Sequence, residues 1–190
     1  MNSMPLSFVC GGFHLGHPAD PWPLPSPRAT GPLAAQLAAA VQQGHLLWPR
    51  TFRSRAAALA CRELLPPGEC PALHGLYLPV DEVARMLDED GGNQGGDELP
   101  VLQLLRAGTA VTAPAAATAG WDVLGFATDQ CWCWLRYRQA RAVAATLRIR
   151  ESVDGLIGDG SAALAMCDEL NGDELGAPVI WRRWWRTIEG

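Results

Sequence analysis

The sequence contains no lysine, so all 15 of its basic residues are arginines. It also has no apolar run that approaches the roughly 18 residues needed for a membrane-spanning helix. The first residues, MNSMPLSFVCGGF, contain neither a basic stretch nor a small-residue cleavage motif, so we expect no signal peptide. These absences predict a cytoplasmic protein that does not bind membranes.

The motifs of the common enzyme classes are absent as well. The chain has no Gly-x-Ser-x-Gly elbow, no dinucleotide fingerprint and no Cys-x-x-Cys redox pair. The glycine pairs at 91–92 and 95–96 lack the lysine and the strand-to-helix setting of a phosphate-binding loop. We therefore predict a protein that is not an enzyme and that uses no cofactor.

Six cysteines are present, and two of them, Cys131 and Cys133, are separated by a single residue. A zinc site needs about four converging ligands, usually as two close pairs, and the histidines are scattered along the chain. No metal site is predicted, and reduced thiols are expected because the spacing is irregular. Two alternatives stay open: an enzyme that uses Cys131 or Cys133 as nucleophile or metal ligand, and a non-catalytic adaptor subunit.

A length of 190 residues with 48% hydrophobic residues suits one globular domain, residues 1–190. Helical and strand patterns alternate, which predicts an α+β or α/β fold with a mixed sheet flanked by several helices. The helical patterns cover residues 33–43, 55–64, 82–90, 99–108, 132–145 and 162–171. The strand patterns cover residues 5–13, 46–52, 74–80, 121–129 and 177–188.

The remaining segments predict loops and helix caps. Residues 16–32 are rich in proline and are expected to form an extended surface loop. Residues 91–98, GGNQGGDE, predict a mobile glycine-rich loop, and residues 109–120 predict a connector. Ser54, Asp81 and Ser161 each stand where a helix N-cap is expected, and Gly44 where a helix stops.

Charge is segregated along the chain. Residues 81–98 contain seven acidic residues and one arginine, and residues 151–176 contain seven acidic residues and no basic one. Between them, residues 136–150 carry five arginines and no acid. With a net charge of −5 the protein is a poor match for nucleic acid, whose phosphates attract basic faces. The runs are either solvated faces that pair within the fold or an acidic surface that attracts a basic partner.

The last strand pattern contains three tryptophans that cannot all point to one side of a strictly alternating strand. One of the adjacent pair, Trp184 and Trp185, is therefore expected at a surface, where tryptophan is a favoured contact residue. The predicted partner-binding residues are Asp81, Glu82, Asp88, Glu89, Asp90, Asp97, Glu98, Asp159, Asp173, Glu174 and Trp184.

Three stretches of the second half carry a family resemblance: GWDVLGFATDQ (120–130), GLIGDGSAALAMCDELN (155–171) and PVIWRRWW (178–185). Together they resemble the carboxyl-terminal half of bacterial immunity proteins that accompany polymorphic, contact-dependent or type VI toxins. Ala127 stands where that pattern has an aspartate, and Arg182 and Arg183 replace less charged residues. The resemblance implies a stoichiometric inhibitor that occludes a cognate toxin, expected to be basic, such as a nuclease or a nucleotide-directed enzyme.

Overall fold

The structure is a computed structural model that describes residues 6–17, 20–24, 31–47, 51–65, 71–90, 100–112, 116–127, 130–172 and 179–189. The strands are β1 (Ser7–His17), β2 (Asp20–Leu24), β3 (Leu46–Leu47), β4 (Thr51–Phe52), β5 (Ala72–Pro79), β6 (Ala110–Thr112), β7 (Thr118–Ala127), β8 (Gln130–Cys133) and β9 (Ile180–Glu189). The helices are α1 (Gly31–Gln42), α2 (Arg55–Arg62), α3 (Val80–Asp90), α4 (Pro100–Ala107), α5 (Arg138–Thr146) and α6 (Gly160–Gly172).

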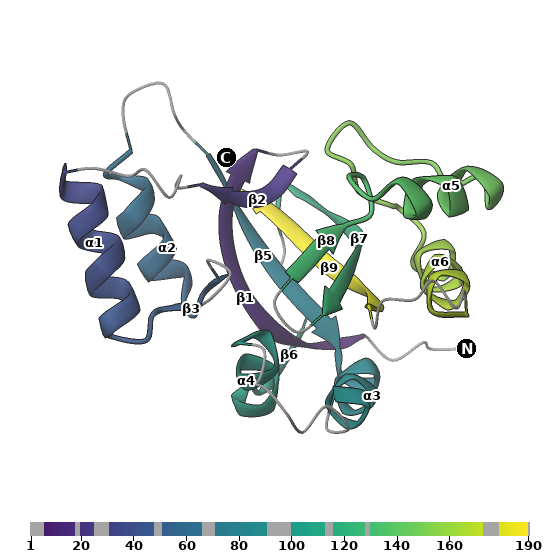
Figure 1. The fold of residues 1–190 in the computed structure, drawn as a ribbon, viewed down its shortest axis with the longest axis horizontal. Coiled ribbons are helices and arrows are strands. Elements are labelled where there is room, and N and C mark those ends of the chain that lie inside the picture. The colour runs from purple at the N-terminus through teal and green to yellow at the C-terminus, as the bar shows by residue number, and fades with distance from the viewer. Residues whose placement is uncertain are drawn as a thin grey trace.

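The strands form one twisted sheet in the order β3-β4-β1-β5-β9-β7-β8, with β2 and β6 also paired to β1. The last strand, β9, lies between β5 and β7 (Figure 1). It therefore joins the sheet of the first half of the chain to the β7–β8 hairpin of the second half. The fold is of the α+β class and forms one domain.

Helices surround the sheet on three sides. Figure 1 shows α1 and α2 at one end, α5 and α6 at the other, and α3 and α4 along the bottom of the view. The largest core cluster lies between the sheet and α3, α4, α5 and α6, and a second cluster lies under α1 and α2. None of the helices within the described ranges is both long and apolar enough to cross a membrane.

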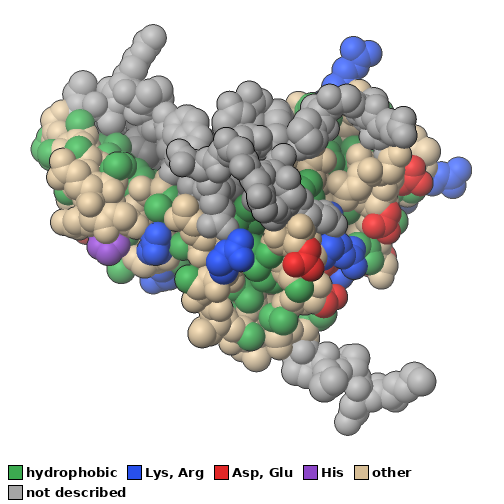
Figure 2. Space-filling model, turned by 60° about the horizontal axis from the view of Figure 1, so that its bottom comes forward, with side chains coloured by type: hydrophobic (Ala, Val, Ile, Leu, Met, Phe, Trp, Pro, Cys, Tyr) green, Lys and Arg blue, Asp and Glu red, His purple; other side chains and the backbone are tan. Residues whose placement is uncertain are grey.

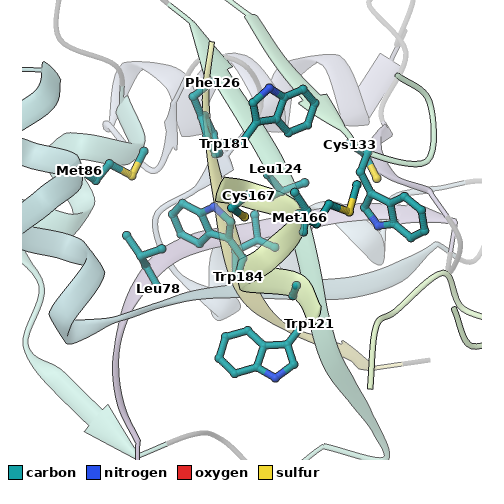
Figure 3. Close-up of a cluster of buried hydrophobic side chains, with 14 of the residues drawn as sticks. Leu78, Met86, Trp121, Leu124, Phe126, Cys133, Met166, Cys167, Trp181 and Trp184 are labelled. Atoms are coloured by element: carbon teal, nitrogen blue, oxygen red, sulfur yellow. The ribbon is translucent and has the colours of Figure 1, made fainter. Parts of the chain in front are cut away.

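A close approach between β1 and β9 fixes the centre of the core. The indole ring of Trp184 is fully buried and reaches across to the backbone of Gly11. A Cβ atom at Gly11 would lie 2.5 Å from Cζ3 of that ring, so only glycine leaves enough room. In Figure 3 the rings of Trp181 and Trp184 leave β9 in different directions, each into a packed region.

Several local predictions are confirmed. Gly44 ends α1 with φ of 68°, a backbone conformation that glycine adopts at little cost. The Ser54 side chain accepts a hydrogen bond from the backbone N–H of Ala57 and so caps α2. The strand pattern around Pro49 corresponds to β3 and β4, which lie at the edge of the sheet as expected.

Other local predictions are wrong, because pairing to β1 overrides weak local signals. Within the expected loop at 16–32, β1 continues to His17 and β2 pairs with it. Within the expected connector at 109–120, β6 pairs with Ser7, Phe8 and Val9 of β1. Every strand pairing among the described residues is antiparallel, so the expected mixed sheet is wrong. The glycine-rich segment 91–98 lies outside the described residues.

The helix expected at 132–145 is also wrong in its first third. Residues 130–133 form β8, which pairs antiparallel with β7, and α5 begins only at Arg138. Two of the expected caps differ as well. Asp81 lies in the first turn of α3, and Asp159 accepts the hydrogen bond from the N–H of Ser161, so Asp159 rather than Ser161 caps α6.

Two histidines face each other inside the sheet. His14 of β1 and His74 of β5 are direct cross-strand partners, and both side chains are buried. The His14 ring contacts the hydroxyl of Thr51 at 3.4 Å. Burial lowers the pKa of His14 from 6.5 to about 4, because the interior disfavours the charged imidazolium.

We expect Gly11→Ala to lower the free energy of unfolding by about 1–3 kcal/mol, because the new methyl group collides with the Trp184 ring. Urea denaturation measures the change. Gly158→Ala is the matched control, since no atom lies within 4 Å of a Cβ built there. Equal stability losses in the two variants would contradict the packing described for β1 and β9.

We expect the protein to lose stability as the pH falls from about 6.5 toward about 4, because the unfolded chain takes up a proton at His14 that the folded chain resists. The full effect is about 3 kcal/mol. The measurement is the difference in unfolding free energy between the wild type and His14→Gln across this range. A His14→Gln variant that loses as much stability as the wild type across this range would contradict the role of His14.

Candidate interaction surface

The strand β9 buries side chains on both of its faces. Its alternation places Arg182, Trp184 and Arg186 on one face and Trp181, Arg183 and Trp185 on the other. Trp184 is 0% exposed, so its predicted role as a partner-contacting residue is wrong. The reason is the central position of β9: both of its faces are covered, so Trp184 is fully buried and Trp185 on the opposite face is only partly exposed.

A fully buried ion pair holds β9 to β7. Arg186 and Asp122 are both 0% exposed, and Nη1 of the arginine lies 3.1 Å from Oδ2 of the aspartate. Arg186 also donates through Nη2 to the carbonyl oxygen of Asp154 at 2.7 Å. Burial raises the pKa of Asp122, and the neighbouring guanidinium opposes that rise.

The thiol of Cys133 belongs to the same buried group. It donates to Oδ1 of Asp122 at 3.7 Å. Burial, together with the charge of Asp122, raises the pKa of Cys133 well above its ordinary value. A cysteine nucleophile needs the opposite, an accessible thiol with a lowered pKa, so this environment is unfavourable for such chemistry. The Cys131 side chain lies outside the part of the chain that the structure describes.

The guanidinium group of Arg183 connects four elements. It forms an ion pair with Glu82 in the first turn of α3, and it donates to the carbonyl oxygen of Gly160 at 2.9 Å, where α6 begins. It also lies over the Trp121 ring of β7, 4.8 Å from the centroid. Arg183 thus holds the amino-terminal turns of α3 and α6 side by side.

This arrangement corrects one predicted contact residue and supports two others. Glu82 is 3% exposed and neutralises Arg183, so it does not face a partner. Its neighbour Asp81 and the cap residue Asp159 are both exposed. Because Arg183 binds beside each of them, the start of the first acidic run lies close to the part of the second run where α6 begins, although the two are far apart in the sequence.

Further acids are exposed on the same two helices. Asp88 is exposed on α3, and Asp168 and Glu169 are exposed on α6. Figure 2 shows acidic side chains on the right half of the visible face, with basic ones between them. We call the exposed residues Asp81, Asp88, Asp159, Asp168 and Glu169 the acidic surface.

The other predicted contact residues are not placed by the structure. Glu89 and Asp90 belong to α3, but their side chains lie outside the described part of the chain. The other four residues lie wholly outside it: Asp97, Glu98, Asp173 and Glu174. Within the described residues, no group of three or more histidine, cysteine, aspartate or glutamate side chains is arranged to hold a metal ion.

That Arg183 links α3 to α6 was not predicted from the sequence. The sequence held a signal for it, because an arginine in an apolar strand pattern needs a carboxylate or carbonyl acceptor when it is buried. Which acid supplies that acceptor depends on the strand order, and the sequence did not define the strand order.

Comparison with protein-family models, with curated proteins and with solved structures gave no match.

We expect Asp122→Asn to lower the free energy of unfolding by about 3–5 kcal/mol, because it leaves the buried Arg186 without its counter-charge. Thermal or urea denaturation measures the loss. The double variant Asp122→Leu, Arg186→Met should recover most of it, since no buried charge remains.

Glu189→Gln provides the control, because it removes the ion pair of Glu189 with Arg55, whose side chain is 53% exposed. Its effect should be far smaller than that of Asp122→Asn. If the exposed and the buried pair proved equally important, the account of the β7–β9 junction would be wrong.

Proposed function

We propose that the protein is an immunity protein that binds a basic bacterial toxin and occludes its active site. The observation that carries the proposal is the junction at Arg183, whose guanidinium binds both Glu82, next to Asp81 in the first acidic run, and Gly160, next to Asp159 in the second. The acidic surface is assembled from separate segments, and two of its acids, Asp81 and Asp159, stand at the helix starts that Arg183 holds. Such a surface is suited to recognising one partner rather than to simple solvation.

The mechanism is affinity rather than catalysis. Exposed carboxylates raise the rate of encounter with a basic partner, and their effect weakens as salt concentration rises. A toxin that acts on nucleic acids or nucleotides needs a basic site of its own, because its substrate carries phosphates. The acidic surface is complementary to such a site. The resemblance of the second half to immunity proteins points to the same class, and a cytoplasmic location fits that role.

A thiol enzyme is the less favoured reading, since Cys133 is buried against Asp122 with a raised pKa. Metal analysis and thiol-reactivity profiling test it directly: a bound metal ion or a hyper-reactive cysteine would support it.

The test of the proposal is co-expression with the product of the adjacent gene. We expect that product to be toxic alone and harmless when this protein is present. The purified pair should associate at a rate that falls with ionic strength. A neighbour that is harmless alone, or that stays toxic beside this protein, would refute the proposal.

A charge-neutralised variant locates the contact. We expect Asp81→Asn, Asp168→Asn and Glu169→Gln together to slow association roughly tenfold at low salt, because they remove exposed charge without disturbing the Arg183 junction. Glu63→Gln is the matched control, as it removes an exposed acid at the end of α2. Slower association in the control alone would place the contact on another face.

A further inference from the structure

The helix α5 and the turn after it carry an exposed set of arginines. Ala140 and Ala144 face the core, whereas Arg138 and Arg141 are exposed. Because they are three positions apart, these two arginines lie on the same side of the helix. Arg148 and Arg150 follow directly and are also exposed.

None of these four side chains forms a hydrogen bond or an ion pair with any part of the chain that the structure describes. Other arginines behave differently: Arg55, Arg183 and Arg186 each pair with a carboxylate. Arg53 and Arg85 are also exposed and likewise have no partner among the described residues, but each stands alone, whereas the α5 region gathers four such arginines within residues 138–150.

Arg148 occupies a backbone position that favours glycine. The N–H of Ile149 donates to the carbonyl of Ala144 and the N–H of Arg148 to that of Ala145, which ends α5 in a Schellman motif. Arg148 is the αL residue of that motif, with φ of 55°, and no other non-glycine residue in the described chain has positive φ. Glycine would relieve a cost of about 1–2 kcal/mol.

The end of α1 has the same backbone conformation, and there the αL residue is a glycine. The N–H of His45 donates to the carbonyl of Ala40 and that of Gly44 to the carbonyl of Val41, so α1 ends in the same motif with Gly44 at the αL position. The two helix ends thus have the same hydrogen-bond pattern, but the αL position holds glycine in α1 and arginine in α5. A strained arginine whose side chain is exposed and forms no hydrogen bond or ion pair with the described residues indicates a role outside the fold.

Exposed aliphatic side chains accompany these arginines. Leu147 is 37% exposed beside Arg148, and Val153 is 93% exposed three residues beyond Arg150. Arginines mixed with exposed apolar side chains are typical of protein–protein contacts. We call Arg138, Arg141, Leu147, Arg148, Arg150 and Val153 the α5 surface.

We propose that the α5 surface is a second interaction site, which binds an acidic segment of a partner protein. Guanidinium groups pair with carboxylates through two parallel hydrogen bonds, and the aliphatic side chains receive apolar residues placed between the acids. A nucleic acid fits less well, because the surface exposes aliphatic rather than aromatic side chains and the whole chain has a net charge of −5. The site consists of other residues than the acidic surface and binds a partner of opposite charge, so it does not depend on the immunity function.

The test uses the full-length protein and fluorescence anisotropy at about 50 mM salt, where charge contacts are weakly screened. The probe is a labelled peptide of about 20 residues in which pairs of glutamates alternate with single leucines. A single-stranded DNA of similar charge serves as the comparison ligand. We expect saturable binding of the peptide and weaker binding of the DNA.

Arg138→Gln with Arg141→Gln should weaken peptide binding roughly 5- to 10-fold, since each exposed pair contributes a modest amount. Arg53→Gln is the control, an exposed arginine beside α2, and should leave binding unchanged. Arg148→Gly is the sharpest variant: we expect its Tm to rise by about 2–4 °C as the strained residue is relieved, while peptide binding weakens roughly 2- to 5-fold.

Opposite changes in stability and binding distinguish an interaction residue from a structural one. The proposal is overturned if the peptide does not bind saturably, or if the DNA binds at least as tightly. It is also overturned if Arg148→Gly leaves binding intact, or if the protein associates with itself through these arginines, which would make the occupant a second copy.

Discussion

The last strand of the chain brings arginines into the interior, and the fold depends on their oxygen acceptors. Arg182 donates to a backbone carbonyl of its own strand, Arg183 pairs with α3 and α6, and Arg186 pairs with β7. A buried guanidinium without such acceptors would cost several kcal/mol. Since β9 lies between β5 and β7, these contacts also join the two halves of the sheet. The packing of Trp184 against Gly11 adds a steric requirement to the electrostatic one.

The same contacts determine what the surface presents. By holding Glu82, Arg183 turns one acid of the first run inward and leaves Asp81 outside, next to the start of α6. Acids are exposed on α3 and α6, and arginines that pair with none of the described residues are exposed on and after α5. We infer a protein whose two oppositely charged surfaces serve binding, and whose buried cysteine and carboxylate serve stability.

Local chemistry predicted part of this structure. Gly44, Ser54 and the helices they bound follow from capping preferences that act within a few residues. The sequence did not indicate that β2 and β6 add to β1, nor that β9 is central, because strand order depends on contacts between distant segments. The error at Trp184 follows from this: the ring that a central strand leaves partly exposed is that of Trp185, and the Trp184 ring lies in the core. The acidic runs were visible in the sequence, but not that Arg183 brings them together.

Hydrogen–deuterium exchange on the protein, with and without the product of the adjacent gene, tests the central claim most directly. The claim is that the starts of α3 and α6 form one binding surface around Arg183. The account predicts that binding protects the backbone amides of the first turns of both helices together, while those of α1 and α2 exchange unchanged. Protection of only one of the two turns, or protection confined to α1 and α2, would contradict it.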